Sequence, residues 1–450
     1  MDAFKLTLSQ ASRLIRRKEL SPLELLKSLL ERIDAYEPRL KAWVAIDRKN
    51  ATAAAHRCSE EAQRGELRGP LHGIPIGVKD IFYTKGMKTT AGSKLLSNFI
   101  PEFDATVVSR LREAGAIILG KTQTTEFAVH DPAPTRNPWN TKHTPGGSSS
   151  GSAAAVSSGM CPAALGSQTG GSTIRPAAYC GIIGLKPTYG RLSRYGILPV
   201  SWSLDHVGVL TRTVEDAAFL LETLAGQDPM DPTTSNLTVP SYRTTLDNLT
   251  IPRLGTLNEF FWDHSSEEVR ENIEKAGRRL ADSGAELTEV KLPRSFQAVH
   301  AAHRIVMTTE GAAYHEEKFQ TRKEDYRPKL RAMIAAGLLT PASAYIRSQR
   351  IRNLFIREIA SSLKDHDCFL TPATPTSAPE GLESTGDPAF NAPWSFCGFP
   401  AITIPTGLTK EGLPLGIQLV GHPFDEQGLL KTAHWCEKVL APKNEPHDPD

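Results

Sequence analysis

Residues 145–159 read PGGSSSGSAAAVSSG, and residues 166–172, close behind them, read GSQTGGS. A composition so rich in Gly and Ser is typical of a flexible linker. The run Ala153-Ala154-Ala155-Val156 instead favours a buried helix, and apolar segments flank both stretches. Because a linker would not lie in the middle of a core, we interpret the two stretches as loops whose backbone closely approaches another group.

The segments on either side alternate between helix and buried strand. Residues 73–80, 116–120 and 181–185 are short apolar runs and are predicted to be strands. Residues 104–114 have helical spacing, with Asp104 as the expected N-cap. Apolar strands without a polar alternation are covered on both faces, so the pattern predicts an α/β fold.

The remaining chain adds helices and strands of the same kind. Ser21-Pro22-Leu23-Glu24 is a capping box that opens a helix, which Glu37-Pro38 is expected to end. Strands at 249–256 and 285–292, with a helix at 266–283, predict a βαβ unit. Further elements are a helix at 51–64, a helical stretch at 326–363 broken near Pro341, and late strands at 367–372, 400–405 and 415–420.

Composition excludes several classes of protein. The 450 residues are 40% hydrophobic and 23% charged, which rules out collagen, coiled coil and general disorder. With 52 basic and 50 acidic residues, the net charge of +2 gives no general attraction to nucleic acid or an anionic membrane. We read no signal peptide and no apolar run near the roughly 18 residues of a membrane helix. The six scattered cysteines, outside zinc spacing, predict reduced thiols in a cytoplasmic protein.

The two small-residue loops and one lysine could carry acyl-transfer chemistry. Such a reaction needs a hydroxyl nucleophile, a base and backbone N–H groups for the oxyanion. Gly170-Gly171-Ser172 offers a hydroxyl and N–H donors, and residues 145–151 offer further hydroxyls. Lys79 ends a predicted buried strand, where desolvation can keep an amine neutral and able to act as a base.

These stretches resemble the amidase signature family, as do CGIIGLKPTYGR at 180–191, LDHVG at 204–208 and GLPLGIQLVG at 412–421. The matching segments follow the family's order over nearly the whole chain. The resemblance implies an α/β amidase signature fold, in which a mixed twisted β-sheet core is covered by helices on both faces behind an N-terminal helical layer. It implies one amidase domain over 1–450, made of a helical segment 1–65, a catalytic core 66–443 and a polar tail 444–450.

The resemblance also implies a Ser–cis-Ser–Lys triad. Ser172 would be the nucleophile, Ser148 the bridging serine with a cis peptide bond, and Lys79 the base. Neutral lysine would deprotonate the bridging serine, which would deprotonate the nucleophile. The supporting residues would be an oxyanion hole of backbone N–H groups at Thr169, Gly170, Gly171 and Ser172, with Ser149 beside the lysine.

The sequence departs from the common family pattern in the same loops. Gln168 stands where aspartate is frequent, Arg175 is displaced relative to the nucleophile, and Ser150 replaces a glycine. We favour a structural role for Arg175. An acyl pocket formed by Phe127, Ile174 and Trp394 is a further hypothesis.

The predicted function is an amidase that hydrolyses carboxamide C–N bonds, with anilides, carbamates and esters within reach, so that urethanase activity is possible. No metal or organic cofactor is expected. We expect a small-molecule amide or related acyl substrate, no nucleic acid and no membrane, and the sequence leaves the oligomeric state open between monomer and homodimer.

Two alternatives stay open at this point. One is the A subunit of a glutamine-dependent tRNA amidotransferase, which belongs to the same family and generates ammonia for a partner subunit. Against it, no acidic residue to hold the glutamine α-amino group is evident in the apolar stretch before Gly398, although Asp387 is close by. The other is a catalytically inactive binding protein, which the complete triad argues against. The G-x-S-x-G match at 147–151 is set aside because no strand precedes it.

Overall fold

The computed structural model describes residues 2–440. Within them, eleven strands form one mixed sheet in the order β1-β3-β2-β4-β6-β5-β10-β11-β9-β7-β8. The strands are β1 (Trp43–Ile46), β2 (Pro75–Lys79), β3 (Ile117–Thr122), β4 (Ala163–Gln168), β5 (Ile183–Lys186), β6 (His206–Thr211), β7 (Arg253–Thr256), β8 (Glu286–Glu289), β9 (Cys368–Pro372), β10 (Ala401–Leu408) and β11 (Pro414–Val420). The predicted polar tail 444–450 lies outside the described residues.

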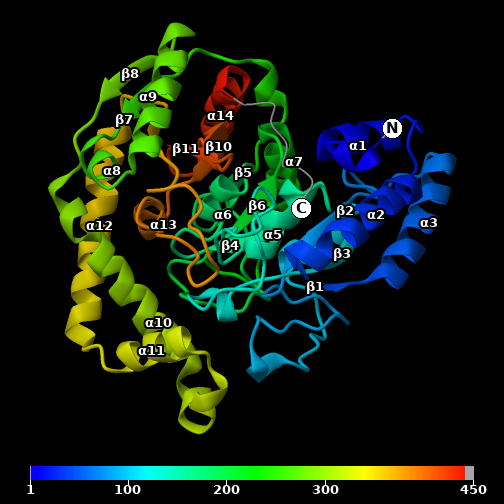
Figure 1. Cartoon of the computed structure of the whole chain (residues 1–450), viewed down its shortest axis with the longest axis horizontal. Helices are drawn as coiled ribbons and strands as arrows, with labels where there is room; N and C mark the ends of the chain where they lie inside the picture. Colours follow the sequence, from blue (N-terminus) through cyan, green and yellow to red (C-terminus); the bar gives the residue numbers. More distant parts are fainter. Residues whose placement is uncertain (1, 441–450) are drawn as a thin grey trace.

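Helices cover the sheet and extend beyond it (Figure 1). They are α1 (Leu8–Arg16), α2 (Pro22–Leu40), α3 (Arg48–Arg64), α4 (Thr106–Glu113), α5 (Ser150–Ser157), α6 (Ile174–Tyr179), α7 (Val214–Leu224), α8 (Glu259–Asp263), α9 (Glu267–Asp282), α10 (Val299–Arg322), α11 (Pro328–Leu338), α12 (Ala342–Leu363), α13 (Ala392–Cys397) and α14 (Glu426–Leu440). The N-terminal helices α1 to α3 lie together at one side of the molecule, and α10 to α12 lie at the other. None of the helices in residues 2–440 combines the length and the apolar character needed to cross a membrane.

Both faces of the sheet are buried, as the sequence predicts. Neighbouring strand residues point into different hydrophobic clusters: Ile118 and Leu165 into one, Leu119 and Ala164 into another. The first cluster contains residues of α4, α7 and α14, and the second contains residues of α3, α5 and α6. The apolar strands therefore lack a polar alternation because each face meets a helical layer.

Strand direction creates the edge at which the site forms. Strand β2 pairs in parallel with β3 and with β4. The carboxyl ends of these three strands therefore lie at one edge of the sheet, and they carry Lys79, Thr122 and Gln168. The loops that follow strands at such an edge commonly form binding sites in α/β proteins.

Several predicted elements are confirmed in kind but shifted at their ends. The capping box of α2 is present, with Ser21 and Glu24 bonding each other's backbone N–H. The predicted end of this helix at Glu37-Pro38 is wrong, since α2 continues to Leu40. A proline in the last turn removes a single backbone bond, and the fully buried Leu40 offsets this cost.

The predicted N-cap of α4 is also wrong. Asp104 accepts a hydrogen bond from the Lys85 N–H at 2.7 Å and pairs with Arg112, while Ala105 occupies the cap position. The βαβ unit is confirmed, because β7 and β8 pair in parallel around α9. The break near Pro341 is confirmed as well, since it separates α11 from α12.

Candidate active site

Lys79, the last residue of β2, is fully buried at the carboxyl edge of the sheet. Its Nζ lies within hydrogen-bond distance of three serine hydroxyls: Ser148 at 2.7 Å, Ser149 at 3.2 Å and Ser167 at 2.8 Å. Desolvation by burial holds the pKa of this amine well below its ordinary value, although the negative charge of Asp205 opposes the shift. The surroundings of Lys79 therefore favour a neutral amine.

The loop with Ser148 and Ser149 is held against the ends of the strands. The Gly147–Ser148 peptide bond is cis. Helix α5 begins at Ser150, and its Ser152 hydroxyl donates to the Leu165 carbonyl of β4 at 2.8 Å. The small side chains of this helix let it pack closely on the sheet, so the Gly/Ser-rich stretch is ordered core rather than linker.

The loop after β4 carries Ser172, whose side chain is only half-buried in an otherwise buried segment. Gln168 holds the loop closed: its Oε1 accepts from the N–H groups of Thr173 at 2.9 Å and Ile174 at 3.0 Å. Its Nε2 donates to Ser395 at 3.1 Å, and Ser395 donates in turn to the Gly170 carbonyl at 2.8 Å. Glutamine at this position can both accept and donate, whereas an ionised aspartate can only accept.

Arg175 is buried and ties the two loops together. Its guanidinium donates to the Gly147 carbonyl at 2.7 Å, to the Gly386 carbonyl at 2.9 Å and to the Thr385 hydroxyl at 3.1 Å. These partners belong to the protein backbone and to a neighbouring loop, as expected for a structural role.

The serine loops also meet directly. The Ser149 N–H donates to the Ser172 carbonyl oxygen at 3.3 Å. In the part of the chain that the structure describes, no hydrogen bond joins the Ser148 and Ser172 hydroxyls. Catalytic hydrogen bonds often tighten only when substrate is bound, so the lack of this bond does not exclude a catalytic pair, and the role of Ser172 stays a prediction.

The three residues suggested for an acyl pocket lie in the hydrophobic core. Phe127 packs edge-on against His315 with ring centroids 4.6 Å apart. Trp394 stacks on Phe261, and Ile174 belongs to the same cluster. All three side chains are buried, and a pocket role for them stays a prediction.

Two residues near Lys79 were not predicted from the sequence as part of the site. Ser167 is the third hydroxyl on Lys79, and Asp205 supplies the negative charge facing that lysine. The motif at 204–208 included Asp205, but its place beside Thr169 depends on the pairing of β4 with β6, which the sequence did not predict.

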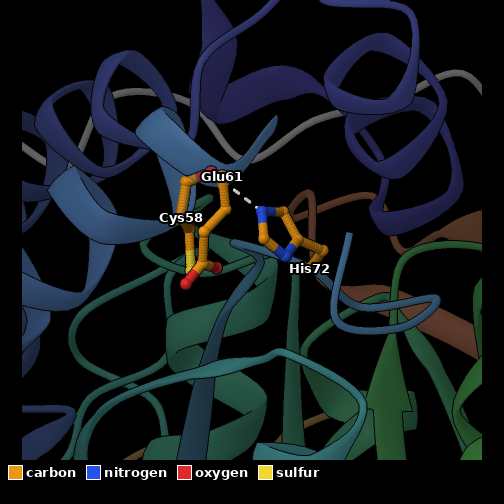
Figure 2. Close-up of side chains that lie close together, drawn as sticks. All are labelled: Cys58, Glu61 and His72. Carbon is orange, nitrogen blue, oxygen red and sulfur yellow. Dashed lines mark hydrogen bonds between the residues drawn. The ribbon is translucent and has the colours of Figure 1, made fainter. Parts of the chain in front are cut away.

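One cluster elsewhere has metal-ligand residue types. Cys58, Glu61 and His72 bring their ligand atoms within 4.8 Å of one another (Figure 2). His72 is engaged through both ring nitrogens, with the Cys58 carbonyl at 2.8 Å and the Arg68 N–H at 3.2 Å. Glu61 pairs with Arg68, and burial raises the pKa of the Cys58 thiol. With all three groups engaged or protonated, the cluster supports no metal site.

The fold and the clustered loops are those of an amidase-type enzyme, as comparison with known proteins shows. The family model described as Amidase matches residues 24–430. The chain belongs to this family, the amidase signature family, as its motifs suggested. The observed mixed sheet with helices on both faces is the fold that membership implies.

Relatives and solved structures cover nearly the whole chain. The A subunit of the glutamyl-tRNA(Gln) amidotransferase of Geobacter metallireducens is 37% identical over 98% of each chain. The solved structure of the corresponding protein from Thermotoga maritima has a TM-score of 0.83 at 32% identity, covering 99% of this chain and 97% of that one. A chain of a vestigial complex tied to the origins of an s-triazine catabolic enzyme has a TM-score of 0.91 at 31% identity, covering 98% and 100%.

These relatives favour the amidotransferase alternative over a free-standing amidase, and they overturn one expectation. We expected a chain whose partners are limited to a small-molecule substrate, without nucleic acid or a further subunit. That expectation is wrong, because the curated relatives are subunits of an enzyme named for a tRNA. A near-zero net charge does not exclude such an assembly, since the charge of one subunit says little about an RNA that the whole complex contacts.

The Gly171→Ala variant is expected to lower kcat/KM for amide hydrolysis by at least about 10²-fold. A Cβ at position 171 would lie 2.6 Å from Oδ1 of Asn391, a buried residue. Asn391 is fixed by hydrogen bonds to Ala373 and Gln418, so the loop would have to move and displace its N–H donors. Steady-state kinetics at fixed pH would measure the loss.

Gly170→Ala is the matched control. A Cβ there would lie 3.7 Å from both His303 and Pro388, an ordinary van der Waals distance. We expect a smaller loss than for Gly171→Ala, and equal losses in the two variants would contradict the steric argument.

Proposed function

We propose that the chain hydrolyses a carboxamide through an acyl-enzyme on Ser172, and that it does so as the A subunit of a glutamine-dependent tRNA amidotransferase. The observation that carries the chemistry is the 2.7 Å hydrogen bond between the buried Lys79 Nζ and the Ser148 hydroxyl. The whole-length similarity to amidotransferase subunits supports the biological setting.

In the proposed reaction Lys79 is the general base and Ser148 relays the proton. Neutral Lys79 takes the proton of Ser148, which takes the proton of Ser172. The Ser172 oxygen attacks the amide carbonyl, and backbone N–H groups of residues 169–172 stabilise the oxyanion. The amine leaves with the relayed proton, and water then attacks the acyl-enzyme to release the acid and restore Ser172.

Glutamine as the amide source is supported by the wall of the site. Pro388 is the residue that a Cβ at Gly170 or at Gly171 would approach, so residues 387–391 adjoin the proposed oxyanion loop. Asp387 is exposed beside Pro388. We propose that its carboxylate holds the α-amino group of glutamine.

The Asp387→Asn variant is therefore expected to raise KM for glutamine by about 10- to 100-fold, the range for losing a charged hydrogen bond. Hydrolysis of an amide without an α-amino group should change by less than about threefold, which provides the control. A KM for glutamine equal to that of the wild-type chain would contradict this role for Asp387.

The assembly is tested by ammonia release from L-glutamine. The chain is assayed alone and together with the other subunits of the amidotransferase, with Ser172→Ala as the blank. Release that requires the other subunits supports the proposal. Hydrolysis of a simple anilide by the chain alone, without glutamine hydrolysis in either condition, would instead establish a free-standing amidase.

The proposal also covers further substrates, the domain organisation and the location of the chain. Anilides, carbamates and esters are substrates that the acyl-transfer machinery could also cleave. The chain would form one amidase domain and act in the cytoplasm, where thiols stay reduced, in keeping with its six free and buried cysteines.

A further inference from the structure

Asp205 lies in the loop just before β6, at the end of the antiparallel pairing of β4 and β6. In that register Gln168 faces His206, so Asp205 and Thr169 follow at the end of the same ladder. Asp205 also lines a cavity of about 430 Å³, together with Ser167, His206 and aromatic side chains. Asp205 therefore lies between the carboxyl edge of the sheet and this cavity.

Both carboxylate oxygens of Asp205 bind donors from separate loops. Oδ1 accepts from the Thr169 hydroxyl at 2.5 Å. Oδ2 accepts from the N–H groups of Val200 at 2.8 Å and Ser201 at 3.0 Å. Thr169 is the first residue of the proposed oxyanion loop, and its carbonyl also binds His303 at 2.9 Å. The carboxylate thus fixes the beginning of that loop.

The same carboxylate acts on Lys79 through space. It forms no ion pair with Lys79 among the described residues, but it lines one cavity with Ser167, whose hydroxyl lies 2.8 Å from the Lys79 Nζ. Burial lowers the pKa of the lysine, and Asp205 is the charged group that raises it. On the neighbouring strand, Lys121 pairs with Asp80 at 3.7 Å, so these two charges largely offset each other.

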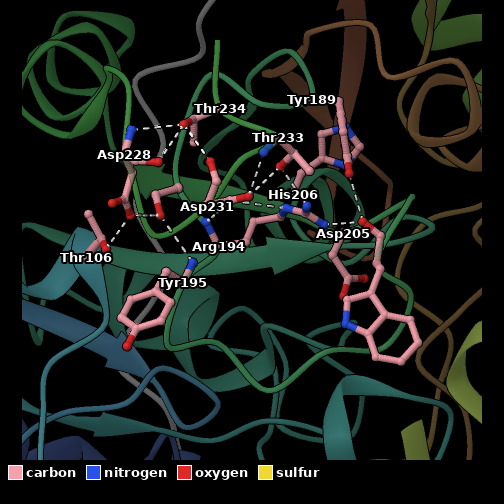
Figure 3. A network of polar contacts seen from close by, with 12 residues as sticks. Thr106, Tyr189, Arg194, Tyr195, Asp205, His206, Asp228, Asp231, Thr233 and Thr234 are labelled. Carbon is pink, nitrogen blue, oxygen red and sulfur yellow. Dashed lines mark hydrogen bonds and ion pairs between the residues drawn. The ribbon is translucent and has the colours of Figure 1, made fainter. Parts of the chain in front are cut away.

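The remaining titratable groups near Asp205 leave its charge facing the lysine. Arg194 faces Asp205 but also pairs with Asp231 at 3.6 Å. Burial holds the pKa of His206 well below its usual value, which keeps that ring neutral (Figure 3). Burial also raises the pKa of Asp205 to about 6, so its charge is present from neutral pH upward.

We propose that Asp205 is a positioning residue with two separable effects: it fixes Thr169 at the start of the oxyanion loop, and its negative charge favours the protonated form of Lys79. The proposal rests on Lys79 as the general base of the proposed function. Removing the charge then lets Lys79 lose its proton at a lower pH, whereas removing the tie displaces the loop without changing the charge.

The first test uses a serine-directed probe, so that it needs no natural substrate. The inactivation rate by phenylmethanesulfonyl fluoride is measured against pH, because it reports the activated Ser172 hydroxyl. In Asp205→Asn the midpoint of the acid limb should move down by about 0.5–1 pH unit relative to the wild-type chain. An unchanged midpoint in folded Asp205→Asn would overturn the charge effect.

Asp228→Asn is the matched control, at the opposite side of the view in Figure 3. Its buried carboxylate also binds hydroxyls and a backbone N–H, from Thr106, Ser193 and Met230. Loss of these bonds without loss of a charge facing Lys79 should leave the midpoint in place. An equal shift in this variant would show that the effect is general and would overturn the proposal.

Thr169→Val removes the tie while keeping the shape of the side chain. The inactivation rate at the pH plateau should fall by about 10-fold or more, with the midpoint of the acid limb unchanged. A wild-type rate in Thr169→Val would overturn the role of the Thr169–Asp205 hydrogen bond in fixing the loop. This variant tests that role even if Asp205→Asn does not fold. In Asp205→Glu, which keeps the negative charge, the midpoint of the acid limb should lie close to the wild-type pH.

The wild-type profile separates this inference from the proposed function. A wild-type chain whose rate has no acid limb would reject Lys79 as the base. A wild-type acid limb that Asp205→Asn leaves in place would reject only the role of Asp205.

Discussion

Replacing Ser172 with alanine is expected to lower kcat for amide hydrolysis by about 10⁴- to 10⁶-fold, because it removes the oxygen proposed to form the acyl-enzyme. The fold should survive. Ser172 is half-buried, and among the described residues its hydroxyl makes no hydrogen bond. The free energy of unfolding should therefore change by less than about 0.5 kcal/mol.

The measurement pairs steady-state kinetics with thermal unfolding, and mass spectrometry checks for a trapped acyl group. Wild-type chain should gain the mass of the acyl group with a slow ester substrate, and Ser172→Ala should not. Ser157→Ala serves as a control, since the hydroxyl of this α5 serine donates to the Cys180 carbonyl at 2.7 Å and has no other partner within residues 2–440. Turnover by Ser172→Ala within tenfold of the wild-type rate would remove Ser172 as the nucleophile.

The parts of the fold that could be predicted were those with strong local signals. The capping box at Ser21, the apolar run before Lys79 and the break at Pro341 each leave a short-range pattern, and each corresponds to an observed element. The ends of the helices were less predictable, because burial in the tertiary structure determines where a helix stops. Leu40 extends α2 past a proline by entering the core, which no pattern around Pro38 reveals.

The residues of the site also differ in how well the sequence predicts them. The glycine-flanked serines and Lys79 stand out by composition and by family resemblance, and the structure brings Lys79 together with Ser148 and Ser149. Ser167 and Asp205 are ordinary residues until β4 pairs with β6. Their contribution comes from register, a long-range property that a single sequence carries only weakly.

The error about partners has a different origin. Net charge describes one chain, whereas one member of an assembly can supply chemistry while the other parts hold the RNA. Surface composition alone therefore could not separate a free amidase from one component of a larger enzyme.

Removal of Lys79, the proposed base, should have the second large effect. Lys79→Met keeps most of the side-chain volume and should lower kcat/KM by about 10²- to 10⁴-fold. In the wild-type chain only the neutral amine can accept a proton, so the rate should fall on acidification as Lys79 becomes charged and reach a plateau above its pKa. Because burial holds this pKa well below the usual 10.5, the plateau should begin well short of that pH.

Stability gives an independent check on the same residue. A lysine whose pKa is lower in the folded than in the unfolded chain binds its proton more tightly when unfolded. Between the folded pKa and about 10.4, the wild-type free energy of unfolding should therefore rise with pH, while Lys79→Met lacks this contribution. The difference in stability between the two chains should shift in favour of the wild type as pH increases.

The pH dependence of the rate and that of the stability together distinguish a titrating Lys79 from a lysine that only binds the three serines. The three serine hydroxyls near its Nζ would lose a hydrogen-bond partner in Lys79→Met, a cost that is present on both sides of the Lys79 titration. Only the titrating amine produces the pH-dependent part. A wild-type rate that stays flat down to about pH 5, with no such pH-dependent difference in stability, would mean that Lys79 is not a neutral base, and the proton relay would have to start elsewhere.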